Sequence, residues 1–322
     1  MTGSSAPRRP IPVIIDTDIG EDIDDILVLA FALSCPQFEV LAVTTVDGDT
    51  VARGRIARRV CAAYGRPSVP VVAGYPRSMP DANEPVPALQ SVTQNAVAPT
   101  EQGLPPACDV PADELIARLA ADRPGEVYLL TIGSMTNAGQ ALVRFPATAT
   151  NLAAIVSNGG NFGPGRPNRI GWNLRYDPVA AAVVARSRAQ WVLLSEGLGI
   201  PGLSHADVDR LATQGLETTD VLHLAILQWR ENKRECNDQS TPHLSDLNTL
   251  AYLMGGWIET SPGRADLVVG PRGTVAELRV AYDADGPHEL SRQLRPDRRD
   301  DLHDLFMEHI LAEPIARKET PT

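Results

Sequence analysis

The chain has 322 residues, of which 43% are hydrophobic and 21% charged, a composition typical of a globular protein with a sizeable core. Its formal net charge of -11 and its pI near 5.0 argue against a surface for nucleic acid or an anionic membrane. No apolar run reaches the length of a membrane span, and the apolar stretch after the two N-terminal arginines is broken by the carboxylates of DTDIGEDIDD, so we expect neither a membrane anchor nor a signal peptide.

The first half of the chain alternates short apolar strands with helices, after a leader at residues 1–10 that we expect to be flexible. The predicted strands span residues 11–15, 38–46, 69–74, 126–133 and 151–160, and the predicted helices span 24–34, 51–65, 113–122 and 136–144. This alternation is typical of a parallel sheet covered by helices. Residues 75–110 interrupt it, because they are rich in Pro, Ala, Gln and Asn and show no period, which predicts a long irregular loop.

The second half continues the pattern. Further helices are predicted at residues 177–187, 205–214, 219–233, 245–255 and 299–312, with a late strand at 276–282. We find no internal repeat and no linker. The sequence therefore predicts an α/β fold, with a single domain over residues 11–315 built on a mostly parallel central sheet flanked by helices.

The four cysteines lie far apart and form no CxxC pair; they are Cys35, Cys61, Cys108 and Cys236. Such spacing is typical of reduced structural thiols, and it favours a cytoplasmic protein.

Six acidic residues stand within ten positions directly after the first predicted strand: Asp16, Asp18, Glu21, Asp22, Asp24 and Asp25. In open parallel sheets, ligands bind just beyond the carboxyl ends of the strands. So many carboxylates repel one another unless a cation or a helix N-terminus offsets their charge. Oxygen ligands without adjacent His or Cys favour Ca²⁺ or Mg²⁺. Capping acids on a solvated turn would account for one or two of these residues better than for all six.

A calcium-binding EF-hand loop and a phosphatase motif both fit the acidic segment less well. An EF-hand loop counted from Asp16 has its glycine at position five and Leu27 at position twelve, where a glycine at six and a glutamate at twelve are needed. A strand followed by DxD also opens haloacid-dehalogenase-type phosphatases, but these have a small residue pair after the second aspartate, where this chain has Ile19-Gly20-Glu21. A phosphohydrolase of this type stays as the second enzyme hypothesis.

Several motifs in order along the chain resemble those of inosine/uridine-preferring nucleoside hydrolases. IPVIIDTDIGEDIDDILVLAFAL resembles the N-terminal signature of that family, commonly DxDxGxDD, with two extra residues between the glycine and the paired aspartates. The resemblance continues in VLAVTTVDGDT, TIGSMTN, NGGN…WNLRYDPVAA and SDLNTLAYL, so it covers almost the whole chain. It implies a nucleoside hydrolase-like domain that cleaves N-glycosidic bonds.

The resemblance also implies roles for individual residues. Asp18, Asp25, Asp246 and the backbone carbonyl of Ile132 would hold Ca²⁺, and Asp24 occupies the position of the general base. The implied substrate-binding residues are Asp49, Asn158 and Asn173, together with His223 and Trp229 on the helix that lines the base pocket in the family. The implied partner is a small nucleoside or riboside, and the implied assembly is a homodimer or homotetramer.

Three departures from the family pattern concern the substrate. The histidine that would protonate the leaving base is Ser245 here, the usual methionine before the glycine pair is Asn158, and the usual glutamate two residues before Asn173 is Gly171. His243 is the nearest substitute for the missing acid. A protein that keeps the metal and binds ribose or a nucleoside without efficient turnover is therefore a further alternative.

Overall fold

The computed structural model describes residues 9–79, 92–235, 241–270 and 275–314. Its strands are β1 Ile11–Thr17, β2 Phe38–Thr45, β3 Val71–Ala73, β4 Tyr128–Thr131, β5 Ala154–Asn158, β6 Trp191–Leu194, β7 Ile258–Val269, β8 Val275–Tyr282 and β9 His288–Leu294. Its α-helices are α1 Asp24–Ser34, α2 Thr50–Ala63, α3 Ala112–Asp122, α4 Thr136–Arg144, α5 Thr148–Asn151, α6 Trp172–Tyr176, α7 Pro178–Arg186, α8 His205–Thr213, α9 Glu217–Glu235, α10 Leu247–Met254 and α11 Arg299–Leu311.

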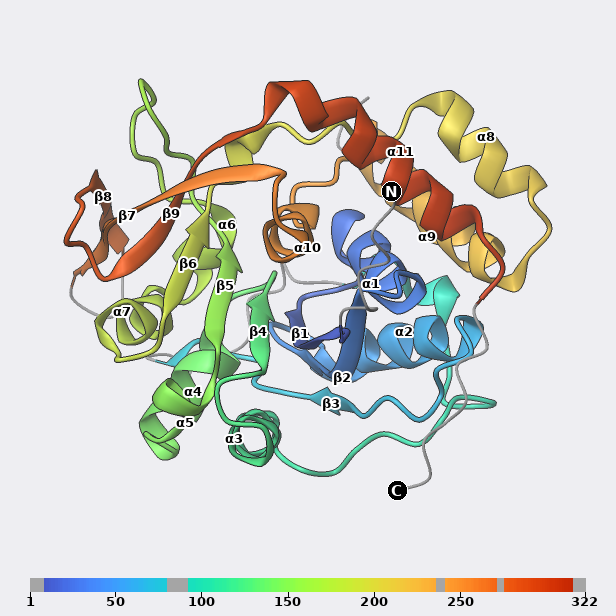
Figure 1. The fold of residues 1–322 in the computed structure, drawn as a ribbon. Helices are drawn as coiled ribbons and strands as arrows, with labels where there is room; N and C mark the ends of the chain where they lie inside the picture. Colours follow the sequence, from blue (N-terminus) through green and yellow to red (C-terminus); the bar gives the residue numbers. More distant parts are fainter. Residues whose placement is uncertain (1–8, 80–91, 236–240, 271–274, 315–322) are drawn as a thin grey trace, which may run out of the picture.

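The strands of the described residues form one nine-stranded sheet in the order β3-β2-β1-β4-β5-β6-β9-β7-β8 (Figure 1). All neighbours from β3 to β9 are parallel, and β7 runs antiparallel to both β9 and β8. The predicted α/β fold with a mostly parallel central sheet flanked by helices is therefore confirmed. The chain runs from β1 outwards to β3 and then returns to the other side of β1, which makes a topological switch point between β1 and β4.

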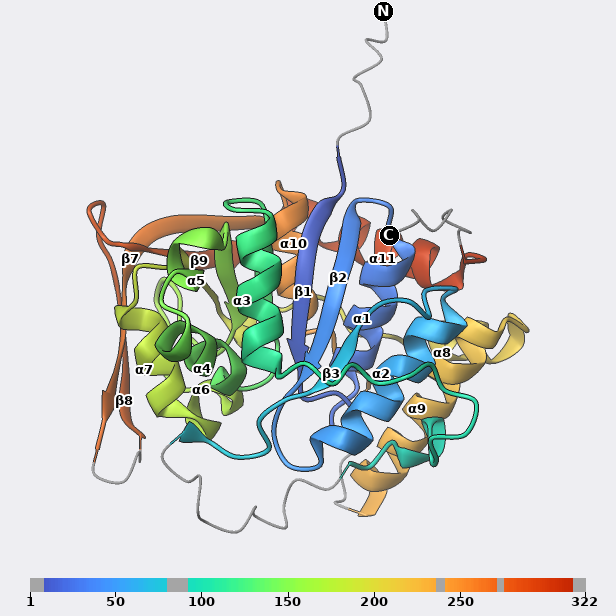
Figure 2. The same ribbon diagram turned by 90° about the horizontal axis from the view of Figure 1, so that it is seen from below.

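Helices cover both faces of the sheet (Figures 1 and 2). One hydrophobic cluster packs α1, α2, α9, α10 and α11 on one face, and a second packs α3, α4 and α7 on the other. Strand β1 contributes side chains to both clusters, because Val13 and Ile15 point into the first and Ile14 points into the second. The core therefore lies in two layers, one on each side of the sheet.

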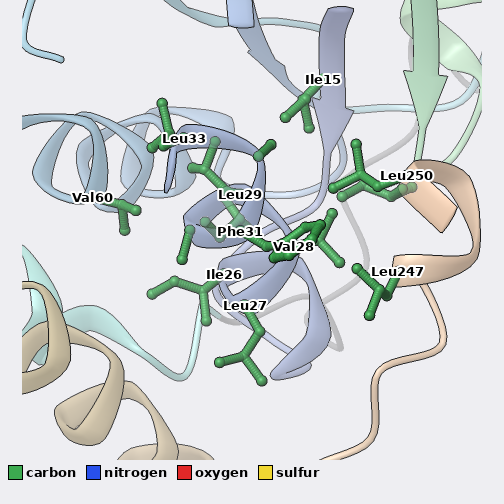
Figure 3. Packing of buried hydrophobic residues seen from close by; sticks show 14 of the residues in the cluster. Ile15, Ile26, Leu27, Val28, Leu29, Phe31, Leu33, Val60, Leu247 and Leu250 are labelled. Carbon is green, nitrogen blue, oxygen red and sulfur yellow. The ribbon is translucent and has the colours of Figure 1, made fainter. Parts of the chain in front are cut away.

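Helix α1 is buried all round, which explains why its apolar residues show no amphipathic period. Figure 3 shows its side chains between Ile15 of β1, Val60 of α2 and Leu247 of α10. Phe31 adds a stacked contact to Phe306 of α11, with ring centroids 5.5 Å apart. This packing fixes the helix that begins with Asp24 and Asp25.

The sequence did not predict strands β6, β7 and β9, or the short helices α5 and α6. Residues 1–8 of the expected leader and residues 80–91 of the expected loop lie outside the described residues. The rest of residues 75–110 contains one short 3-10 helix, Asn95–Val97. Over the described ranges, no helix combines the length and the apolarity needed to cross a lipid bilayer.

Candidate active site and metal centre

Residues that line one cavity gather where four neighbouring strands end. Asp18 follows β1, Ile132 follows β4, Asn158 ends β5 and Glu196 follows β6. These strands are consecutive in the sheet, and the row begins at the switch point between β1 and β4. All four residues line one cavity of about 630 Å³. The cavity therefore lies where open parallel sheets bind ligands.

Three aspartates meet at the base of this site. Asp24 and Asp25 open α1, and Asp246 is the N-cap residue of α10. Their ligand oxygens lie within 4.8 Å of one another, and all three residues are buried. The Asp246 backbone N–H donates to Asp24 Oδ2 at 3.4 Å, so the N-termini of two helices converge on the cluster. The partial positive charge at a helix N-terminus stabilises a nearby carboxylate, but here two helix N-termini face three carboxylates.

Burial dominates the electrostatics of this cluster. It raises the pKa of Asp24 to about 6, against the opposing effect of His243. Burial, and then the neighbouring carboxylates, raise the pKa values of Asp25 and Asp246 well above their ordinary range. A cation would relieve both the burial cost and the repulsion. An all-oxygen donor set suits a hard divalent ion, so these carboxylates form a site that can hold a metal ion.

Asp18 lines the same cavity beside this cluster. Burial raises the pKa of Asp18, and the nearby positive charge of Arg53 opposes this shift. The buried guanidinium of Arg53 holds the loop, since it donates to the carbonyls of Asp18 and Ile19. The expected ligands Asp18, Asp25 and Asp246 thus line the same cavity, and ligand oxygens of Asp25 and Asp246 lie within 4.8 Å of each other.

The two extra residues after Gly20 form a turn that is held by hydrogen bonds from another segment of the chain. The carbonyl of Gly20 accepts hydrogen bonds from the backbone N–H groups of Thr93 at 2.8 Å and Gln94 at 3.0 Å. The Gln94 amide donates to the carbonyl of Asp22 at 2.7 Å. Gly20 has a φ of +108°, and a Cβ there would lie 2.8 Å from both Ile56 and Val92. Part of the 75–110 segment therefore shapes the acidic turn.

Hydrogen bonds connect three residues of the cavity lining: Ile132, Asn158 and Asn173. Asn173 Nδ2 donates to the carbonyl of Ile132 at 2.8 Å and to that of Asn158 at 3.1 Å. Asn158 Nδ2 donates to Asp246 Oδ1 at 2.8 Å and to Ser245 Oγ at 3.0 Å. Asn158 thus orients Asp246, and Asn173 touches the carbonyl that was expected to bind the metal.

His243 lines the same cavity and lies between two carboxylates. Its Nε2 is 3.6 Å from Asp22 Oδ2 and 3.6 Å from Asp24 Oδ2. Trp229 is fully buried, its indole N–H donates to Asp22 Oδ1 at 2.8 Å, and its ring centroid is 6.4 Å from that of His243. Trp229 therefore supports His243 and Asp22 and does not itself line the cavity.

Asp49 and His223, two further residues expected to bind substrate, do not line this cavity. His223 is half-buried on α9. Asp49 is exposed and caps α2, because its carboxylate accepts from the N–H of Ala52 at 2.9 Å. The structure gives Asp49 a capping contact outside the cavity.

We expect Asp49→Ala to lower the free energy of unfolding by about 0.5–2 kcal/mol, because an N-cap acceptor is lost. Asp49→Asn should keep most of that stability, since asparagine caps as well. Denaturant unfolding of the three proteins measures the difference. A KM for substrate that rises in Asp49→Asn at unchanged stability would instead assign Asp49 to the sugar.

The sequence analysis missed several cavity residues, among them Glu196, Trp172 and Lys233. Glu196 directly follows Ser195 at the end of β6, so recognising that strand would have pointed to it. Trp172 has 49% of its surface exposed and opens α6 one residue before Asn173. Lys233 lies near the end of α9, above the Trp229 ring.

The metal-free fold should lose stability as pH rises. Burial raises the pKa of Asp16 to about 7 and that of Asp24 to about 6, so the folded chain holds protons that the unfolded chain has already released. Their contribution to stability is therefore lost as pH rises from about 4 to about 7. Thermal unfolding in chelator at pH 5.5, 7 and 8 measures this. A divalent cation should raise the Tm more at pH 8 than at pH 5.5, because it binds the ionised cluster. A cation effect that is equal at both pH values would contradict the assignment.

The profile of the Inosine-uridine preferring nucleoside hydrolase family matches residues 13–300. A probable uridine nucleosidase 1 from Oryza sativa subsp. japonica is 31% identical over 196 residues, which are 58% of this chain and 59% of that protein. The pyrimidine-specific ribonucleoside hydrolase RihA from Salmonella paratyphi C is 29% identical over 268 residues, 79% of this chain and 83% of that protein.

The fold is also shared with a solved structure. The purine-preferring ribonucleoside hydrolase from Gardnerella vaginalis has a TM-score of 0.77 at 19% identity, covering 95% of this chain and 100% of that one. The chain spans 59% of the length of the Oryza relative and 54% of that of uridine nucleosidase 1 from Arabidopsis thaliana. The match over residues 13–300 favours this family over the haloacid-dehalogenase-type phosphatases. The chain belongs to the inosine-uridine preferring nucleoside hydrolase family.

Proposed function

We propose that this chain hydrolyses the N-glycosidic bond of a nucleoside or related riboside, with Asp24 as the general base. The observation that carries the proposal is the meeting of Asp24, Asp25 and Asp246 in one cavity at the switch point of the sheet. The family match supports the reaction class.

We propose that the metal ion is Ca²⁺, held by Asp18, Asp25, Asp246 and the carbonyl of Ile132. All four groups line the cavity and offer oxygen ligands only, which fits a hard cation. Bound there, the ion would lower the pKa of the attacking water and orient sugar hydroxyls.

Individual side chains have distinct roles in the proposed reaction. Asp24 accepts a proton from the water that attacks the anomeric carbon, while the bond to the base breaks through an oxocarbenium-like state. The carboxylates around the sugar stabilise the positive charge of that state. Asn158 holds Asp246 in place through its 2.8 Å hydrogen bond, and Asn173 lies beside the carbonyl of Ile132. His243 faces the cavity next to Asp24 and is the candidate proton donor to the leaving base.

The test is the release of free ribose from inosine, adenosine, uridine and cytidine, with Ca²⁺ or with a calcium chelator. We expect release with Ca²⁺ and loss of release on chelation. Binding of a nucleoside without release of ribose would make the chain a binding protein. Stimulation by Mg²⁺ but not by Ca²⁺ would overturn the choice of ion.

The proposal includes a homodimer or homotetramer, which light scattering after gel filtration would test. It also includes a reducing, cytoplasmic location, for which the support is that Cys61 and Cys108 form no disulfide within the described residues.

A further inference from the structure

The side chain of Glu196 occupies space that exists only because residue 171 is a glycine. A Cβ on Gly171 would lie 1.8 Å from Glu196 Oε1 and 2.5 Å from the backbone nitrogen of Gly160. The backbone of Gly171 is extended, with φ -84° and ψ 177°, a conformation open to any residue. The close approach of the Glu196 carboxylate and of the Gly160 backbone therefore explains this glycine, and backbone freedom does not.

Glu196 is anchored firmly in that space. Its Oε1 accepts from the Gly160 N–H at 3.1 Å, and its own N–H donates to the Gly160 carbonyl at 2.9 Å. Just before it, Ser195 Oγ accepts from the N–H groups of Phe162 at 3.1 Å and Gly197 at 3.3 Å. Among the described residues, no hydrogen bond reaches the second carboxylate oxygen, Oε2. One oxygen of Glu196 is thus fixed and the other is left for a ligand.

The surroundings say what kind of ligand that is. Glu196 lines the same cavity as Asp24, and burial, with a smaller effect of the Asp24 charge, raises its pKa to about 7. Asp18, Asp25 and Asp246 line this cavity as well. A wall made largely of acceptors suits a ligand that brings donors, and the hydroxyl groups of a sugar are such donors.

We propose that Glu196 is a substrate-binding residue whose Oε2 accepts a hydrogen bond from one sugar hydroxyl, in a place that Gly171 keeps open. The sugar as ligand rests on the proposed function. A site built to bond a hydroxyl rejects the analogue that lacks it, because its polar group is then left unpaired. Glu196 should therefore set the requirement for one particular hydroxyl of the substrate.

The probe is an iminoribitol, a ribose mimic with nitrogen in place of the ring oxygen, which cannot be hydrolysed. Calorimetry with Ca²⁺ would compare it with its three deoxy forms, each lacking one hydroxyl. The wild-type protein should bind one deoxy form about 10- to 100-fold more weakly than the parent, as expected for a hydrogen bond to a carboxylate. Glu196→Ala should weaken the parent by a similar factor and leave the Kd of that deoxy form unchanged.

Gly171→Ala should weaken binding of the parent at least as much as Glu196→Ala does, because the methyl group takes the place of Oε1 and also meets the Gly160 backbone nitrogen. In the Glu196→Ala background the same change should add less than in the wild-type protein, because only its contact with the backbone nitrogen of Gly160 remains. Gly54→Ala is the matched control: a Cβ there meets nothing within 4 Å, and all Kd values should stay as they are. If Glu196→Ala or Gly171→Ala fails to fold, Glu196→Gln replaces it in the test, because glutamine keeps the size of the side chain.

Three results would overturn the proposal. They are equal weakening of all four ligands by Glu196→Ala, no weakening in either Glu196 variant, and no binding of the iminoribitols to the wild-type protein. Failure of the proposed function is separate: the hydroxyl-specific pattern without ribose release from any nucleoside would leave Glu196 as a binding residue and remove the hydrolase. Ribose release together with an unchanged hydroxyl preference in Glu196→Ala would keep the hydrolase function and remove Glu196 as the residue that binds the hydroxyl.

Discussion

Asp24→Asn is expected to lower kcat by about 10²–10⁴-fold, the usual worth of a general base, while KM changes much less. Asparagine has the same shape but cannot take a proton from water. Asp24 is 5% exposed, and burial raises its pKa to about 6, so its carboxylate is ionised at neutral pH yet still basic enough to accept a proton.

The control variant is Asp304→Asn on α11, where the carboxylate is 87% exposed and is not part of the cavity lining. It should keep the wild-type kcat, and both variants should keep the wild-type far-ultraviolet circular dichroism. Steady-state release of ribose with saturating Ca²⁺ measures kcat and KM. Turnover of Asp24→Asn within a few-fold of wild type would remove Asp24 from the mechanism.

The fold was predictable from sequence where buried elements are short and regular. The apolar stretch 24–34 was predicted as a helix, and α1 has the same bounds because it is buried on all sides. Strand β7 was missed because it contains Glu259, Pro262 and Arg264, and proline and charge argue against a strand. Pairing with β9 and β8 overrides that local preference, with a register shift between Glu259 and Thr260.

The site was predictable only in part for a related reason. The carboxylates after β1 are dense enough in sequence to be seen without a structure. Glu196 follows a four-residue strand with no period to reveal it, and its partner Gly171 was interpreted only as the loss of a glutamate. The structure shows that Gly171 makes room for Glu196, so a carboxylate reaches the cavity from another segment.

The leaving group gives the second large effect. Ser245 stands where the family usually has an acid, and its hydroxyl accepts from Asn158 and donates to the carbonyl of Glu196 at 3.4 Å. A serine cannot protonate a departing base at neutral pH. The proposed donor is His243, whose imidazole lines the cavity with its Nε2 3.6 Å from Asp24 Oδ2. Its side chain is 44% exposed, so we expect it to serve less well than a fixed donor.

Nitrophenyl riboside has a leaving group that departs without a proton, whereas inosine and uridine need one. General acid help is worth about 10²–10⁴ in rate, so kcat/KM for nitrophenyl riboside should exceed that for inosine and uridine by up to this factor. His243→Ala should slow the two nucleosides further and leave nitrophenyl riboside nearly unchanged. Ser245→His, which places an imidazole beside Asp246, should narrow the gap. Equal kcat/KM values for inosine and nitrophenyl riboside in the wild-type enzyme, together with no effect of His243→Ala, would show that another group delivers the proton.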